Sequence, residues 1–131
     1  MNRTRRLLAA ILVLIVFACA CSSDTNERTL TAENAGQSIE MSVGETFLVE
    51  LEGNPTTGFT WEVAKIDPAV LKQVGKTEFE SQSDLVGAGG VMILHFEVIG
   101  NGDADLQLVY HRPWENDIPP ENTFTTIINV K

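Results

Sequence analysis

Apolar side chains recur at every second position over most of the chain after residue 37. The clearest series are Ile39, Met41 and Val43; Phe47, Val49 and Leu51; and Ala104, Leu106, Leu108 and Tyr110. A period of two is typical of strands with one buried and one exposed face, because successive side chains of a strand point to opposite sides. No window has the period of a convincing amphipathic helix. The pattern therefore predicts an all-β domain.

Further strands are predicted over residues 60–63, 71–77, 91–99 and 123–130, with a short first strand near 29–31. Asn101-Gly102 suits a tight hairpin, because both residues tolerate positive φ. Seven or eight short, mostly antiparallel strands separated by regular turns are typical of an immunoglobulin-like β-sandwich. We expect Trp61 to be the large residue of its core.

The N-terminal segment has the pattern of an export signal. Arg3, Arg5 and Arg6 precede an unbroken apolar run over residues 7–20. That run is shorter than the roughly 20 residues that span a bilayer as a helix. A basic start followed by a short apolar stretch indicates a secretory signal peptide, which we assign to residues 1–21.

The end of this leader resembles the lipobox of bacterial lipoproteins, in which a cysteine is lipidated and becomes the new N-terminus. Cys21 is followed directly by small polar residues, so we expect lipidation there, with Cys19 as the alternative. The protein would then be an exported cell-envelope lipoprotein, held at the membrane by its lipid alone; ordinary cleavage would instead give a secreted protein. Residues 22–37 are predicted to be a polar tether, and residues 38–131 the folded domain.

The chain after the leader contains no cysteine, which leaves no disulfide, thiol nucleophile or thiolate metal site in the domain. It carries six basic and 18 acidic residues, a net charge of −12 with histidine neutral. Such a surface repels phosphate backbones, so we do not expect nucleic-acid binding. It favours encounter with a basic partner.

Neither histidine belongs to a catalytic pattern. No cysteine, Ser-His-Asp spacing or HxxxH pattern accompanies His95 or His111, and His95 is expected to be an ordinary strand residue. Asp103 and Asp105 alternate outward beside a turn, without the further ligands of a calcium loop. We therefore expect neither an enzyme nor a metal or cofactor site.

Three connecting segments differ in composition from ordinary polar loops. The first is Asn54, Pro55, Thr56, Thr57, Gly58 and Phe59; the second is Leu85, Val86, Gly87, Ala88, Gly89 and Gly90; the third is Arg112, Pro113 and Trp114. Proline, β-branched threonines and a glycine that permits a reversal predict a stiff, protruding first segment. The glycines of the second allow another backbone to approach closely. The third is typical of an exposed aromatic anchor.

Two predicted strands separate each of these segments from the next. In an antiparallel fold, two strands return the chain to the same end, so the three segments should meet there as antibody binding loops do. Taken singly, each has a plainer interpretation: a turn, a flexible linker and a tryptophan packed under its own loop. Together they predict a binding surface.

In this order and spacing, NPTTGF, LVGAGG and RPW resemble the chagasin family of cysteine protease inhibitors, over residues 38–131. The resemblance implies an eight-stranded immunoglobulin-like sandwich that reversibly inhibits papain-like peptidases with a wedge of three loops. It implies that Thr56 and Thr57 lie nearest the catalytic residues of the peptidase, with the other two loops along either side of its cleft. Such inhibitors include exported bacterial proteins, in agreement with the leader.

We expect this inhibitor to act as a monomer. A stiff turn can fill a protease cleft without presenting a carbonyl in line with the nucleophile, so attack on it is not assisted. The alternative is a non-inhibitory cell-envelope binding or adhesion module that uses the same loops.

Overall fold

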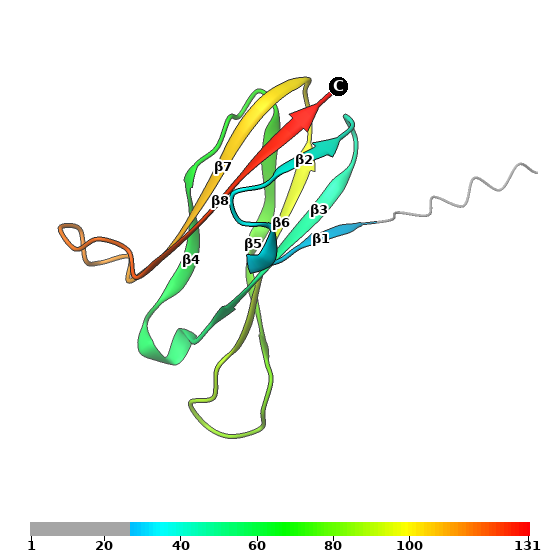
Figure 1. The fold of residues 1–131 in the computed structure, drawn as a ribbon. Coiled ribbons are helices and arrows are strands. Elements are labelled where there is room, and N and C mark those ends of the chain that lie inside the picture. The colour runs from blue at the N-terminus through cyan, green and yellow to red at the C-terminus, as the bar shows by residue number, and fades with distance from the viewer. Residues whose placement is uncertain (1–26) are drawn as a thin grey trace, which may run out of the picture.

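The computed structural model describes residues 27–131 and shows two β-sheets packed face to face (Figure 1). The strands are β1 (Arg28–Leu30), β2 (Ser38–Met41), β3 (Thr46–Gly53), β4 (Thr60–Lys65), β5 (Leu71–Ser81), β6 (Gly90–Val98), β7 (Gly102–His111) and β8 (Asn122–Val130); two 3₁₀ turns are η1 (Ala32–Asn34) and η2 (Pro55–Thr57). The sheets have the orders β1-β3-β6-β5 and β2-β8-β7-β4. The predicted all-β, immunoglobulin-like sandwich is confirmed, with eight strands in the described range.

Pairing between the strands is mostly antiparallel, as predicted. Within residues 27–131, β6 pairs antiparallel with β3 and β5, and β7 pairs antiparallel with β4 and β8. The two N-terminal strands are the exceptions, since β1 pairs parallel with β3 and β2 pairs parallel with β8. The chain closes one edge of the first sheet, crosses over through η1 and closes an edge of the second.

The alternating apolar residues fill the space between the two sheets. Phe47, Val49 and Leu51 of β3 are at most 3% exposed. The ring of Phe47 stacks on that of Phe96 with centroids 5.2 Å apart. Trp61 is 3% exposed and is the large core residue that the sequence predicted. Burying a side chain of this size contributes about 1.5–3 kcal/mol.

The prediction of a buried side chain is wrong for one residue of these series. Val43 was expected on the inner face of its strand, yet its side chain is 50% exposed. Strand β2 ends at Met41, and Gly44 follows with a φ of 93° in the turn toward β3. The chain has therefore left the sheet before Val43 reaches the core.

The short strand predicted near residues 29–31, within the segment assigned as a polar tether (residues 22–37), is present as β1, and the second part of that segment belongs to the sandwich. Leu30 of β1 is 2% exposed. Beyond η1, the carbonyl of Gln37 accepts hydrogen bonds from Ile127 N at 3.0 Å and from the buried Thr126 hydroxyl at 2.8 Å. The segment is polar in composition because a strand of three residues buries a single side chain. Its backbone pairing, which composition does not reveal, holds it in place.

The predicted signal peptide, the lipobox with Cys19 and Cys21, and the first part of the tether lie outside the described residues. Within residues 27–131, no helix has the length and apolar character needed to cross a membrane.

Candidate functional site

Three loops leave the sandwich on the side away from the C-terminus (Figure 1). They are the NPTTGF loop (residues 54–59) between β3 and β4, the glycine loop (residues 82–89) between β5 and β6, and the RPW loop (residues 112–121) between β7 and β8. Two strands separate each loop from the next, so the predicted clustering at one end is confirmed. Gly90, which the sequence placed in a loop, is instead the first residue of β6.

Strand pairing places the bases of the loops side by side. Gly53, just before the NPTTGF loop, pairs with Gly90, just after the glycine loop. Thr60, just after the NPTTGF loop, pairs with His111, just before the RPW loop. The NPTTGF loop therefore passes from one sheet to the other and has one of the remaining loops on each side.

The NPTTGF loop is held by hydrogen bonds within itself. Asn54 is extended, with a φ of −139°, and its Oδ1 accepts from the backbone N of Thr56 at 3.1 Å and from the Thr56 hydroxyl at 2.6 Å. The Thr57 hydroxyl donates to the carbonyl of Asn54 at 2.6 Å. Gly58 closes the turn with a φ of 85°, in the left-handed region that glycine adopts readily. The loop is thus a capped 3₁₀ turn.

A side-chain hydrogen bond connects the NPTTGF loop to the glycine loop. Asn54 Nδ2 donates to the carbonyl of Gly87 at 3.0 Å. Leu85 and Val86, at the tip, are 77% and 105% exposed. At the base, a Cβ on Gly90 would stand 2.0 Å from the carbonyl oxygen of Glu80, so this position requires glycine. The sequence predicted that a backbone could approach the glycine cluster closely, and at Gly90 the backbone of Glu80 does so.

The RPW loop contacts the other side of the NPTTGF loop. Arg112 Nε donates to the carbonyl of Thr57 at 3.0 Å, and its guanidinium lies 4.5 Å from the ring centroid of Phe59. Arg112 Nη1 also pairs with Glu115 at 3.2 Å. Trp114 packs against Gly58 while remaining 66% exposed, as expected of an exposed anchor.

A column of aromatic rings joins this end to the core. Tyr110 lies between Phe59 and Trp61, with ring centroids 5.2 Å from each. Its hydroxyl accepts a hydrogen bond from the backbone N of Asn54 at 2.8 Å. The sequence indicated only that Tyr110 lies on the inner face of its strand; its support of the NPTTGF loop was missed. A tyrosine at the loop end of an otherwise aliphatic series was the available signal.

A second feature that sequence reasoning missed is Ile118 in the RPW loop. Its side chain is 59% exposed. It stands between an aspartate and a pair of prolines, Pro119 and Pro120. Together with Leu85 and Trp114, it adds exposed apolar surface to the loop end, and an isolated apolar residue in a polar loop was the signal for it.

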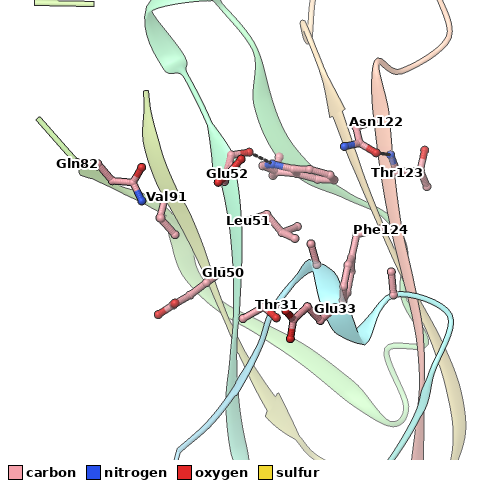
Figure 2. A pocket seen from close by; sticks show the side chains of 13 residues that line it. Thr31, Glu33, Glu50, Leu51, Glu52, Gln82, Val91, Asn122, Thr123 and Phe124 are labelled. Atoms are coloured by element: carbon pink, nitrogen blue, oxygen red, sulfur yellow. Dashed lines mark hydrogen bonds between the residues drawn. The ribbon is translucent and has the colours of Figure 1, made fainter. Parts of the chain in front are cut away.

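A cleft of about 590 Å³ opens between β3 and β8 below the loops (Figure 2). Figure 2 shows Glu50 and Gln82 on one side and Asn122 and Thr123 on the other. Its lining contains neither cysteine nor histidine and so offers no nucleophile paired with an imidazole base. The dashed line at Glu52 marks the bond from Trp61 Nε1 to the Glu52 carbonyl, 3.0 Å long, which fixes β3 just before the NPTTGF loop.

The polar residues weighed from the sequence as possible sites do not form a common site. His95 is partly exposed, but its Nε2, 3.5 Å from a carboxylate oxygen of Glu78, is buried and has no hydrogen-bond partner within the described residues. Asp105 pairs with Lys65 at 2.8 Å, and Asp103 accepts from Asn129 at 2.8 Å. Within residues 27–131, no group of three or more histidine, cysteine or acidic side chains is arranged to hold a metal ion.

Comparison with known proteins gives consistent matches over the domain. The family model described as "Chagasin family peptidase inhibitor I42" matches residues 40–128. The chain is 32% identical to chagasin of Trypanosoma cruzi over 103 residues, which cover 76% of this chain and 94% of chagasin.

Solved structures with the same fold include the crystal structure of the cysteine protease inhibitor EhICP2 from Entamoeba histolytica. It is similar with a TM-score of 0.70 and 20% identity, covering 79% of this chain and 95% of EhICP2. PbICP-C, in a structure with falcipain-2, is similar with a TM-score of 0.54 and 22% identity, covering 79% of this chain and 99% of PbICP-C.

Proposed function

Since the chain belongs to the chagasin family of cysteine peptidase inhibitors, we propose that it blocks papain-like peptidases by laying its three loops across the active-site cleft. The observation that carries this proposal is that both outer loops bond directly to the central one. Asn54 reaches the glycine loop at 3.0 Å, and Arg112 of the RPW loop reaches Thr57 at 3.0 Å. The three loops therefore form one surface before any partner arrives. A surface ordered in advance loses less conformational entropy on binding.

The central loop fits a cleft without serving as a substrate. A peptidase cleaves an extended segment whose carbonyl is aligned with its nucleophile. In the η2 turn the Asn54 and Pro55 carbonyls accept hydrogen bonds from Thr57 N and Gly58 N, at 3.2 and 3.0 Å. The Thr57 carbonyl accepts from Arg112. These carbonyls accept hydrogen bonds from within the inhibitor and lie in a turn, so they are not aligned as those of an extended substrate. We therefore expect the peptidase to cleave this loop slowly or not at all.

The flanking loops supply the apolar contacts. Leu85 and Val86 project on one side of the central loop and Trp114 on the other, all with most of their surface exposed. Tryptophan and arginine are the residue types most often found as hot spots of interfaces. Three loops of this size are compatible with the ~800 Å² per partner of protease–inhibitor complexes. The similarly folded PbICP-C is itself found with falcipain-2, which supports a peptidase as the partner of this chain.

The test is inhibition by the purified protein without its leader, residues 22–131. The protein is titrated against papain and a cathepsin with a fluorogenic peptide substrate. We expect activity to fall stoichiometrically and the inhibitor to remain intact on a gel after prolonged incubation. Full peptidase activity at micromolar protein, across several papain-like enzymes, would contradict the proposal and favour the non-inhibitory binding module.

We also propose that the protein is exported and anchored in the cell envelope by a lipid on Cys21. The support is the leader pattern and the small polar residues that follow this cysteine. Mass spectrometry of the mature N-terminus tests it, with Cys19→Ser as the matched control for Cys21→Ser. If only the Cys19→Ser variant lost the lipid, Cys19 would be the lipidated residue. An unmodified N-terminus in the wild type would indicate a secreted protein.

A further inference from the structure

Asn54 uses both ends of its side-chain amide inside the protein. Its Oδ1 accepts from Thr56 N and from the Thr56 hydroxyl, and its Nδ2 donates to the carbonyl of Gly87. Both acceptor positions of the oxygen and one of the two N–H donors are thus used, which leaves a single N–H for a partner. We propose that Asn54 is a positioning residue that fixes the glycine loop relative to the central turn, rather than a contact of the peptidase. This inference rests on the proposed function.

The oxygen and the NH₂ group of the Asn54 amide have separate roles. The oxygen caps the first turn of η2, a role for which asparagine, aspartate and serine are all suited. The amide NH₂ group is the part that reaches the neighbouring loop, 33 residues further along the chain. A substitution can therefore keep the cap and remove the connection.

The connection is the single hydrogen bond from the glycine loop to another loop within residues 27–131. The other hydrogen bonds of the glycine loop are local. Leu85 N bonds to the Ser83 hydroxyl, Ala88 N bonds to the Leu85 carbonyl, and Gln82 N bonds to the Gly89 carbonyl with a length of 3.4 Å. These bonds shape the loop but do not orient it relative to the NPTTGF loop.

The loop that Asn54 holds has few packing contacts to replace that bond. Leu85 and Val86 have most of their surface in solvent, and a Cβ at Gly87 would meet no atom within 4 Å. With so few packing contacts, the orientation of the glycine loop relative to the NPTTGF loop depends on one hydrogen bond of modest net strength. Without it, the glycine loop has to be ordered at the moment of binding, which slows productive association.

The experiment compares Asn54→Ser and Asn54→Asp with the wild type. Both variants keep an acceptor for the cap and lack the amide NH₂ group that donates to Gly87, and only Asn54→Asp adds a charge. Asn101→Asp, in the hairpin turn between β6 and β7, is the control for an added charge away from the loops. Amide hydrogen exchange of residues 85–89 is measured in the free proteins. Association and dissociation rates are measured with a peptidase that the wild type inhibits.

We expect faster exchange in the glycine loop of both Asn54 variants, unchanged exchange in the strands, and an association rate lower by about three- to tenfold, the equivalent of one hydrogen bond. The fold-loss of affinity caused by Val86→Ala should be smaller in the Asn54→Ser background than in the wild type, because an untethered loop makes fewer of its contacts. A residue that merely stabilises the fold would not change this coupling.

Two results would overturn the proposal. Weaker inhibition with unchanged exchange in residues 85–89 would make Asn54 a direct contact of the peptidase. Faster exchange with an unchanged association rate would show that the position of the glycine loop does not matter for binding. A wild type that inhibits no peptidase would overturn the proposed function itself, and the exchange data would still decide whether Asn54 holds the loop.

Discussion

The indole of Trp114 lies so close to Gly58 that a Cβ at Gly58 would stand 2.3 Å from Cη2 of the ring. Gly58 also has a φ of 85°, which side chains rarely adopt. The glycine therefore serves two purposes: it reverses the chain at the end of η2, and it leaves space for an exposed aromatic ring from another loop. Trp114 is 66% exposed, yet its position is set by this contact.

Replacing Gly58 with alanine should impair inhibition more than stability. The strained φ costs about 1 kcal/mol of folding free energy, and the methyl group has to displace the Trp114 ring. Gly36→Ala is the matched control, because Gly36 has a φ of 77° with no atom near its Cβ position. Thermal unfolding should shift similarly in both variants. The inhibition constant should rise at least tenfold for Gly58→Ala, which corresponds to a loss of about 1.4 kcal/mol in binding free energy, and should not change for Gly36→Ala. Equal inhibition by the two variants would contradict this prediction.

Replacing Trp114 with alanine should weaken binding by about 2 kcal/mol or more, as for other tryptophan anchors at interfaces. The fold should tolerate the change, since two thirds of the side chain is in solvent. Ile99→Ala is the control: this side chain is also exposed, at 42%, but follows β6 at the opposite end of the sandwich. Inhibition constants and unfolding midpoints are measured for both. Undiminished inhibition by Trp114→Ala would exclude the anchor role.

The sequence predicted the sheets and the loop end better than the connections between them. Alternation and turn residues suffice to place strands, because the side-chain period of a strand is independent of its partner. The clustering of the three loops followed from counting strands. The bond from Asn54 to Gly87 and the support of Asn54 by Tyr110 join positions 33 and 56 residues apart. No local pattern reveals such pairs.

The N-terminal segment illustrates the same limit. The short strand predicted near residues 29–31 is present as β1. The polar composition of the segment did not show that Gly36 and Gln37 also form backbone hydrogen bonds with β8. Strand β5 extends to Ser81, beyond the predicted end at residue 77, and includes Gly75 with a φ of 71° where the pairing with β6 shifts. An irregular strand interrupts the alternation on which the prediction depends.

Replacing Arg112 with lysine should weaken inhibition although the charge is retained. The guanidinium donates to the Thr57 carbonyl, pairs with Glu115 and lies over Phe59, and a lysine ammonium lacks the planar fork that does all three at once. We expect a loss of about 1–2 kcal/mol in binding, on the scale of a charged hydrogen bond and a cation–π contact.

Arg28→Lys is the control for this substitution. Arg28 also donates to a backbone carbonyl, that of Glu40 at 2.7 Å, but it does so in β1, away from the loops. The inhibition constant should be unchanged in this variant. If the two arginine variants inhibit equally well, the RPW loop does not depend on the guanidinium for its position.

Replacing Tyr110 with phenylalanine should separate loop support from core packing. The ring remains stacked between Phe59 and Trp61, while the backbone N–H of Asn54 loses its acceptor. We expect the free energy of unfolding to fall by about 1 kcal/mol and the affinity for the peptidase to fall about threefold or more, because the NPTTGF loop is less firmly held.

Thr126→Val is the matched control. It removes one hydroxyl from a buried site on β8, where that hydroxyl donates to a backbone carbonyl at 2.8 Å. The two variants should lose similar stability in urea titrations, and only Tyr110→Phe should inhibit less well. Parallel losses of inhibition in both would mean that affinity follows overall stability, and that the Tyr110 hydroxyl has no specific role at the loop.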